Sequence, residues 1–164
     1  MTRVALSNRD YSAGVRVLGI RTYRDRLCWA VVEGVSRANA TVANHGIVSI
    51  PSGSRDSSLA WVRREIAALV EQEQPEAVAL CPAEGATANT ALVERAQVDG
   101  VALEVLHTLG VEVESRKTAT IRSGFGSKNS EQFESALAQV PAIANIPKTS
   151  ARRDPVVAAV SLLS

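Results

Sequence analysis

The stretch VRVLGIRTYRDRLCWAVVEG, residues 15–34, contains an apolar run, a short turn rich in charge, and a second apolar run. The first run, over 15–20, consists mainly of β-branched and aliphatic residues, and the second, over 27–33, has the same character. Residues of this kind favour strands, and two such runs joined by a short polar turn are typical of a β-hairpin. The sequence therefore predicts an antiparallel hairpin near the start of the folded region.

The segment after the hairpin predicts a third antiparallel strand and then a helix. A short strand over about 46–50 ends at Pro51, which opens the turn cluster PSGSRDSS. Either Asp56 or Ser57 can cap the helix that follows. Its apolar residues recur at steps of three and four, and it must end before Pro75.

The next part of the chain alternates between strand and helix patterns. The run EAVALC, 76–81, is short and continuously apolar, as in a parallel strand buried on both faces. Residues 87–109 have one apolar helical stripe, and 111–115 read as a fifth strand. A short helical turn over 117–123 and a flexible loop over 124–130 complete this part.

Two further helices end the predicted order of elements. One covers 130–140 with Ser130 as its cap, and the other covers 154–163, where Asp154 and Pro155 suit the first turn. The resulting order is β-β-β-α-β-α-β-α-α. It predicts an α/β fold with a mixed five-stranded sheet, whose first three strands are antiparallel, and with helices on both faces.

Size and composition indicate a single domain. A chain of 164 residues and 17.4 kDa, with 46% hydrophobic and 21% charged residues, buries one core. We expect a flexible arm over 1–14 and one domain over 15–164. The net charge of +1 gives no global attraction to nucleic acid or to a membrane surface, and no apolar run is long enough to span a bilayer.

The cysteines and histidines do not form a recognisable ligand pattern. Cys28 and Cys81 both lie inside apolar runs, so we expect two small buried side chains and no disulfide, as in a protein of the reducing cytoplasm. His45 and His107 have no patterned partner for a metal.

Three segments resemble the Holliday-junction resolvase (RuvC-type) branch of the ribonuclease H-like superfamily. These are VLGI at 17–20, GFGSKNSEQFESAL at 124–137, which is similar to a Gly-x-Gly-Ser loop that leads into a helix, and DPVVAAVSLL at 154–163, which is similar to a C-terminal Asp-Ala-Leu-Ala helix. The resemblance implies the three-layer ribonuclease H-like fold.

The resemblance also implies a site of four carboxylates, which would hold two divalent cations, Mg or Mn, about 3.5 to 4 Å apart. The corresponding positions in this sequence are Arg21, Cys81, Ala151 and Asp154. Only one of the four is a carboxylate. We therefore expect no metal and no cofactor, unless the protein is a divergent nuclease.

Arg21 is the most informative of these replacements, because it adds a fixed positive charge where the cations would lie. We expect Arg21 and Asp154 to be neighbours and to form an ion pair; the alternative is that Arg21 anchors a phosphate or a carboxylate. A rearranged metal site would have to recruit Glu84 and Asp25 together with Asp154.

Three functions remain open. The first is a catalytically silent domain that acts as a binding or assembly module and forms a homodimer through helix 87–109, whose small residues Ala88, Ala91 and Ala102 permit close helix packing. The second is a nucleic-acid-binding protein that does not cleave, with basic residues around the cleft. These residues are Arg21, Arg24, Arg26, Lys128, Arg152 and Arg153. The third is a divergent metal-dependent nuclease.

Overall fold

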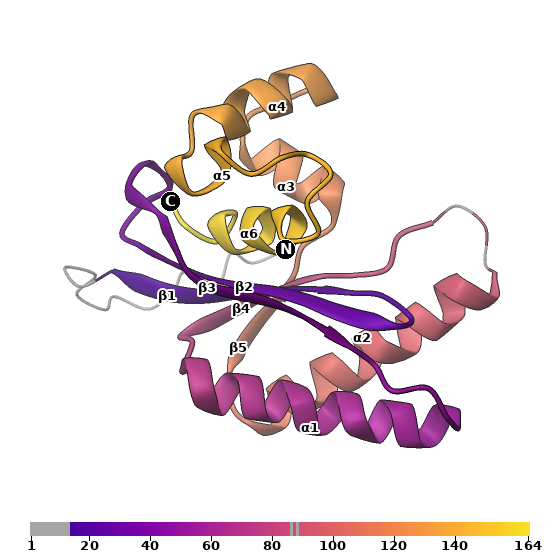
Figure 1. Ribbon diagram of the computed structural model, residues 1–164. Helices are drawn as coiled ribbons and strands as arrows, with labels where there is room; N and C mark the ends of the chain where they lie inside the picture. Colours follow the sequence, from indigo (N-terminus) through magenta and orange to yellow (C-terminus); the bar gives the residue numbers. More distant parts are fainter. Residues whose placement is uncertain (1–13, 86, 88) are drawn as a thin grey trace.

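The centre of the computed structural model is a mixed sheet with helices on both faces (Figure 1). The structure describes residues 14–85, 87 and 89–164, so the predicted arm lies outside the described residues except for Gly14. The strands of the sheet are β1 (Val15–Thr22), β2 (Arg26–Gly34), β3 (Thr41–Ser49), β4 (Ala77–Cys81) and β5 (Glu112–Ser115). The predicted α/β class and the predicted hairpin are confirmed.

The helices lie in two layers, one on each side of the sheet. They are α1 (Arg55–Glu73), α2 (Thr90–Thr108), α3 (Thr118–Gly124), α4 (Ser130–Ala138), α5 (Pro141–Ala144) and α6 (Arg153–Val160), and a 3₁₀ turn, η1, covers Arg37–Asn39. Helices α1 and α2 cover one face, and α3 to α6 cover the other (Figure 1). No helix within the described ranges has the length and apolar character needed to cross a membrane.

The strand order β3-β2-β1-β4-β5 puts the hairpin strand β1 in the middle of the sheet. β1 pairs with β2, and β2 with β3, in antiparallel fashion, whereas β1, β4 and β5 are parallel. In this register Arg21 lies between Cys28 of β2 and Cys81 of β4. Register partners point to the same face of a sheet, so these three side chains form one row.

Alternate residues of β1 face the two helical layers. Leu18 and Ile20 are fully buried in the core that α1 and α2 form with the sheet. Val17 and Gly19 face the other layer, where α6 packs directly on β1. Because Gly19 has no side chain, α6 approaches closely and brings Asp154 to the same end of β1 as Arg21.

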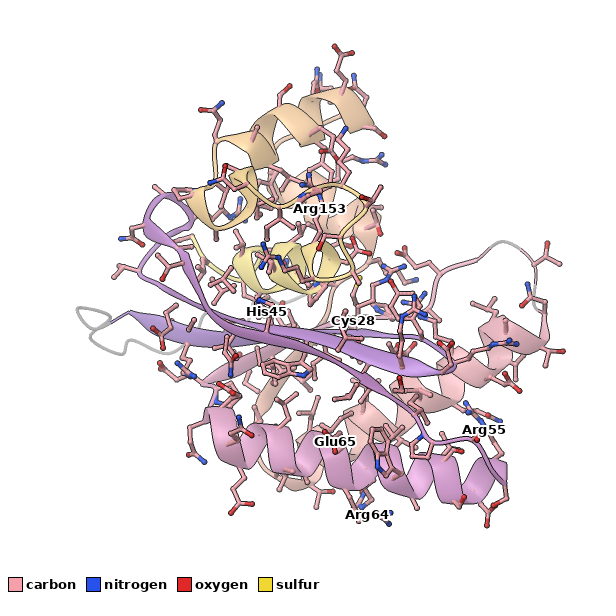
Figure 2. The ribbon with its side chains drawn as sticks, in the orientation of Figure 1. Cys28, His45, Arg55, Arg64, Glu65 and Arg153 are labelled. Carbon is pink, nitrogen blue, oxygen red and sulfur yellow. The ribbon has the colours of Figure 1, made fainter. Side chains whose placement is uncertain are left out.

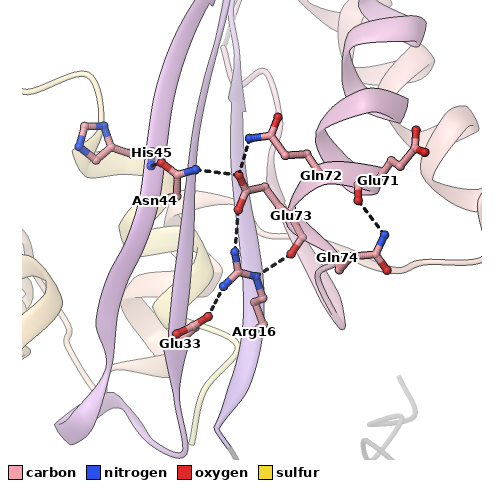
Figure 3. A network of polar contacts seen from close by, with 8 residues as sticks. All are labelled: Arg16, Glu33, Asn44, His45, Glu71, Gln72, Glu73 and Gln74. Carbon is pink, nitrogen blue, oxygen red and sulfur yellow. Dashed lines mark hydrogen bonds and ion pairs between the residues drawn. The ribbon is translucent and has the colours of Figure 1, made fainter.

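A polar network ties the opposite end of β1 to α1 (Figure 3). The Arg16 guanidinium pairs with Glu33 and donates to the side chain of Glu73 at 2.7 Å and to its carbonyl oxygen at 2.6 Å. Asn44 of β3 donates to the same Glu73 carboxylate at 2.7 Å. The Glu73 side chain is only 4% exposed, so this charge depends on Arg16.

The structure differs from the predicted elements mainly at their ends. Strand β3 begins at Thr41, not near residue 46, because an edge strand that is largely exposed carries no continuous apolar run. Helix α1 begins at Arg55, ahead of both predicted caps. Asn129, not Ser130, caps α4 through its side-chain oxygen, which accepts from the backbone N–H of Gln132. The single-turn elements η1 and α5 were not predicted, since such short pieces show no periodicity.

Candidate functional site

The candidate site surrounds Arg21, which ends β1 together with Thr22. Its Nε lies 3.2 Å from Oδ2 of Asp154, so the predicted ion pair is confirmed. Its Nη1 donates to Sγ of Cys81 at 3.3 Å. The buried Nε–H makes no hydrogen bond within the described residues, because its contact with Asp154 has the distance of an ion pair but not the geometry of a hydrogen bond. We call this place, with Arg21, Cys81 and Asp154, the Arg21 cleft.

The charges in the Arg21 cleft come from Arg21 and Asp154, not from Cys81. Burial raises the pKa of the Cys81 thiol and outweighs the opposite effect of Arg21, so the thiol is neutral near pH 7. Burial alone would lower the pKa of Arg21, but its contacts with Cys81 and Asp154 raise the pKa overall. The guanidinium therefore keeps its charge although it is mostly buried.

Three guanidinium groups meet at the ring of Tyr23, in the turn of the hairpin. The centre of the Arg26 guanidinium lies 4.2 Å from the ring centroid, and those of Arg21 and Arg95 lie at 5.5 Å. Arg95 also donates to the backbone carbonyl of Cys81 at 3.2 Å. Burial and the nearby Arg21 lower the pKa of Arg95. No sequence pattern identified Arg95, which reaches the cleft only because α2 packs beside the end of β4.

The acidic residues of the predicted rearranged metal site have other partners. Glu84 accepts from the backbone N–H of Thr118 at 3.1 Å and from its hydroxyl at 2.7 Å, and Asp25 pairs with Arg26 at 3.5 Å. Among the residues that the structure describes, no three His, Cys, Asp or Glu side chains are placed to hold a metal ion. With Arg21 paired to Asp154, the side chains do not fit a pair of divalent cations.

The remaining predicted basic residues lie on separate elements of the fold. Arg24, in the hairpin turn, is 60% exposed and lies 3.9 Å from Glu94. Arg152 contacts the ring of His45 on β3 at 3.2 Å. Lys128 is exposed in the loop before α4. Ala151, the remaining carboxylate position of the resemblance, is half-buried in the turn before α6.

Arg153 lies deeper, within the layer of α4, α5 and α6 (Figure 2). Its guanidinium donates to Oε2 of Glu134 at 2.6 Å and to the carbonyl of Ile146 at 2.7 Å. Arg21 and Arg153 line one cavity of about 80 Å³. The other residues around this cavity are Cys81, Thr118, Ile121, Phe133, Glu134, Leu137, Asp154 and Val157. The sequence placed Arg153 with Arg21 among the basic residues around the cleft, but it gave no sign that the Arg153 guanidinium would be held by Glu134 and Ile146.

Comparison with known proteins identifies the fold. No family model and no curated protein matches the chain. Among solved structures, RuvC from Thermus thermophilus is similar with a TM-score of 0.73 and 18% identity, over 90% of this chain and 92% of that one. T. thermophilus RuvC in complex with a Holliday junction substrate gives 0.71 and 17%, over 90% and 91%. The yeast mitochondrial Holliday junction resolvase Ydc2 gives 0.64 and 11%, over 90% and 78%.

These similarities cover nearly the whole described chain at low identity, so they concern the backbone arrangement. They agree with the strand order of the sheet, with its antiparallel hairpin, and with the two helical layers. The chain therefore has the ribonuclease H-like fold, in the form found in RuvC Holliday junction resolvases.

Proposed function

We propose that this protein binds nucleic acid through the Arg21 cleft and the adjoining hairpin turn, and that it does not cleave what it binds. The observation that carries the proposal is the Arg21–Asp154 ion pair. Two-metal hydrolysis needs several carboxylates around the cations. Here Asp154 is the one carboxylate left of the four expected positions, and the Arg21 guanidinium neutralises its charge. A fixed cation at this place would also repel incoming metal ions.

The hairpin turn supports the binding part of the proposal. Arg24 and Arg26 are 60% and 42% exposed, and both lie with Arg21 and Tyr23 in the sequence RTYRDR, 21–26. Guanidinium groups suit phosphate oxygens because they donate two parallel hydrogen bonds. One solved structure with this fold holds a Holliday junction. Since the net charge is only +1, attraction to phosphate must come from such local clusters.

Binding and cleavage are separated in one experiment. Fluorescently labelled four-way junction, duplex and single-stranded DNA are titrated at low ionic strength, and the same samples are incubated with Mg²⁺ or Mn²⁺. We expect binding that weakens steeply with salt, and intact DNA after incubation. Absence of any salt-sensitive binding would overturn the proposal, and so would metal-dependent cleavage that the Asp154→Ala variant abolishes.

The contribution of the hairpin turn is measured with a double variant, Arg24→Gln/Arg26→Gln. Its affinity should fall several-fold, and the slope of log K against log salt should decrease by about 1 for each lost phosphate contact. Arg64→Gln is the matched control, because Arg64 is exposed on α1, on the other side of the sheet (Figure 2). Equal loss in the control would mean that the turn has no special role.

We also propose that the protein is a homodimer that pairs through α2. Five exposed residues follow one another on α2 at steps of three and four, the spacing of a helix-pairing seam. They are Val93, Ala96, Gly100, Leu103 and His107. We call them the α2 seam. A Cβ atom on Gly100 would meet nothing within 4 Å, so the middle of the seam is open to a second helix.

The small residues named from the sequence contribute less to this surface than expected. Ala102 is fully buried in the core between α2 and the sheet, so it cannot contact a partner. Ala88 lies outside the described residues. Ala91 is exposed, but it lies two residues before Val93, and residues two apart on a helix do not share a face. The α2 seam therefore replaces these alanines as the proposed contact.

A further inference from the structure

We infer that the cavity between Arg21 and Arg153 binds a phosphate group, and that Asp154 is an internal counter-ion which the bound phosphate displaces. This inference deepens the proposed function by naming the chemical group that enters the cleft. It depends on the proposed function only for the source of that phosphate.

The cavity has the size and the donors for a small oxyanion. Its volume of about 80 Å³ is several times the roughly 10–15 Å³ that one water molecule needs. Arg21, from β1, and Arg153, from α6, both line this space. Guanidinium donors from two directions suit a tetrahedral anion better than a planar carboxylate.

The hydrogen bonding of Arg21 is incomplete. Its Nε–H is buried and has no hydrogen-bond partner within the described residues, although Asp154 lies 3.2 Å away. A buried donor of this kind is uncommon, and it is usually satisfied by a group that the protein itself does not supply. A phosphate oxygen in the cavity would supply the missing acceptor.

The two carboxylates at the cavity differ in how firmly they are held. Asp154 is 51% exposed in the first turn of α6, so its side chain can rotate into water when another anion arrives. Glu134 accepts from Arg153 at 2.6 Å and lies 3.5 Å from Lys148, so two cations compensate its one charge. Displacement of Asp154 therefore leaves a net positive cavity.

The small volume and the partly apolar lining of the cavity favour a terminal phosphate over a phosphodiester. Its lining includes Ile121 of α3, Phe133 and Leu137 of α4, and Val157 of α6. A space of about 80 Å³ lined in this way holds a single phosphate group more readily than a chain that continues on both sides of it. The end of a nucleic acid strand, or free inorganic phosphate, has the required chemistry.

Isothermal titration calorimetry with inorganic phosphate tests the site directly. We expect the unmodified protein to bind phosphate, the Asp154→Asn variant to bind it about tenfold more tightly, and the Arg21→Gln variant to lose binding. Arg64→Gln, on the other side of the sheet, should bind like the unmodified protein. Unchanged or weaker binding by Asp154→Asn would overturn the inference. This result remains decisive if Arg21→Gln does not fold, since Asp154 is half exposed.

Oligonucleotides of one sequence, with a 5′-phosphate or a 5′-hydroxyl end, identify the source. A preference of at least fivefold for the phosphorylated end, absent in Arg21→Gln, would support both the inference and the proposed function. Binding of inorganic phosphate without binding of either oligonucleotide would support the cavity and overturn the proposed function. If the protein binds both oligonucleotides with equal affinity, and Asp154→Asn does not change that affinity, the inference is overturned and the proposed function is left intact.

Discussion

Gly19 of β1 and Pro155 of α6 are packed so closely that a methyl group does not fit between them. A Cβ atom on Gly19 would overlap with the carbonyl oxygen of Pro155 and would lie 3.2 Å from the Cβ of Ala159. Gly19 and Arg21 point to the same face of the sheet, and Asp154 precedes Pro155 in the chain. This contact between backbones therefore sets the distance across which Arg21 and Asp154 pair.

The Gly19→Ala variant should lose about 2–3 kcal/mol of its free energy of unfolding, because the added methyl group forces α6 away from the sheet. Urea unfolding followed by circular dichroism measures the change. Gly124→Ala is the matched control: a Cβ atom there comes no closer than 3.9 Å, to the Arg37 guanidinium, so alanine at the end of α3 should change the free energy of unfolding by less than about 1 kcal/mol. Equal changes at both sites would contradict the close packing of α6.

Two arginines of β1 should differ strongly in their effect on stability. Arg16→Met leaves the Glu73 carboxylate, only 4% exposed, without its cation, and a broken buried pair costs about 3–5 kcal/mol. Arg21→Met leaves Asp154 without its cation, but this carboxylate is 51% exposed and solvated. The loss in free energy of unfolding should therefore stay below about 1 kcal/mol. Urea unfolding of both variants under one set of conditions makes the comparison. Similar losses would mean that the Arg16 network in Figure 3 is not the main polar support of the sheet.

Glu84 should make the stability of the protein depend on pH in the acidic range. Burial alone would raise the pKa of Glu84, but hydrogen bonds from Thr118 and the charges of Arg21 and Lys117 lower it overall. A carboxyl whose pKa is lower in the folded state stabilises the protein above its unfolded pKa, about 4.3, and this contribution disappears as the pH falls through the folded value.

The Glu84→Gln variant should accordingly be less stable than the unmodified protein at pH 7. The difference should be at most about 1 kcal/mol, as for a lost helix cap, because solvent screens the charge of the exposed carboxylate. The difference should shrink below about pH 4. Thermal unfolding from pH 7 to pH 3 measures both. Thr118→Val removes only the hydroxyl donor and keeps the backbone N–H, so its effect should be smaller and should follow the same pH trend. A difference that does not vary with pH would refute the role of the Glu84 charge.

The sequence was sufficient for features that depend on local pattern. Hydrophobic periodicity predicted the order of the long elements. The resemblance to RuvC-type resolvases, in which the positions of Arg21 and Asp154 border one site, predicted their ion pair. Contacts between distant segments were not predictable in the same way. Arg95 looks like an ordinary helix-surface cation in the sequence, and only the packing of α2 brings it to the cleft. Arg153 was expected near the cleft, but its contacts with Glu134 and Ile146 depend on how α4, α5 and α6 pack.

The α2 seam makes an equally specific prediction about assembly. In an antiparallel pair of helices related by a two-fold axis at Gly100, Leu103 of one copy lies near Ala96 of the other, so a large side chain faces a small one. We expect light scattering to give a mass approaching twice 17.4 kDa as the protein concentration rises. A mass of one chain at every concentration would refute the proposed homodimer.

The Leu103→Glu variant places a charge in the middle of that pairing. The dissociation constant of its dimer should therefore be at least tenfold higher than that of the unmodified protein. Leu109→Glu is the matched control, since Leu109 is 46% exposed but follows the end of α2 and lies outside the α2 seam. If the two variants dissociate alike, an apolar surface elsewhere on the molecule holds the dimer. A change confined to Leu103→Glu assigns the contact to the seam, because both variants add the same charge to an exposed leucine.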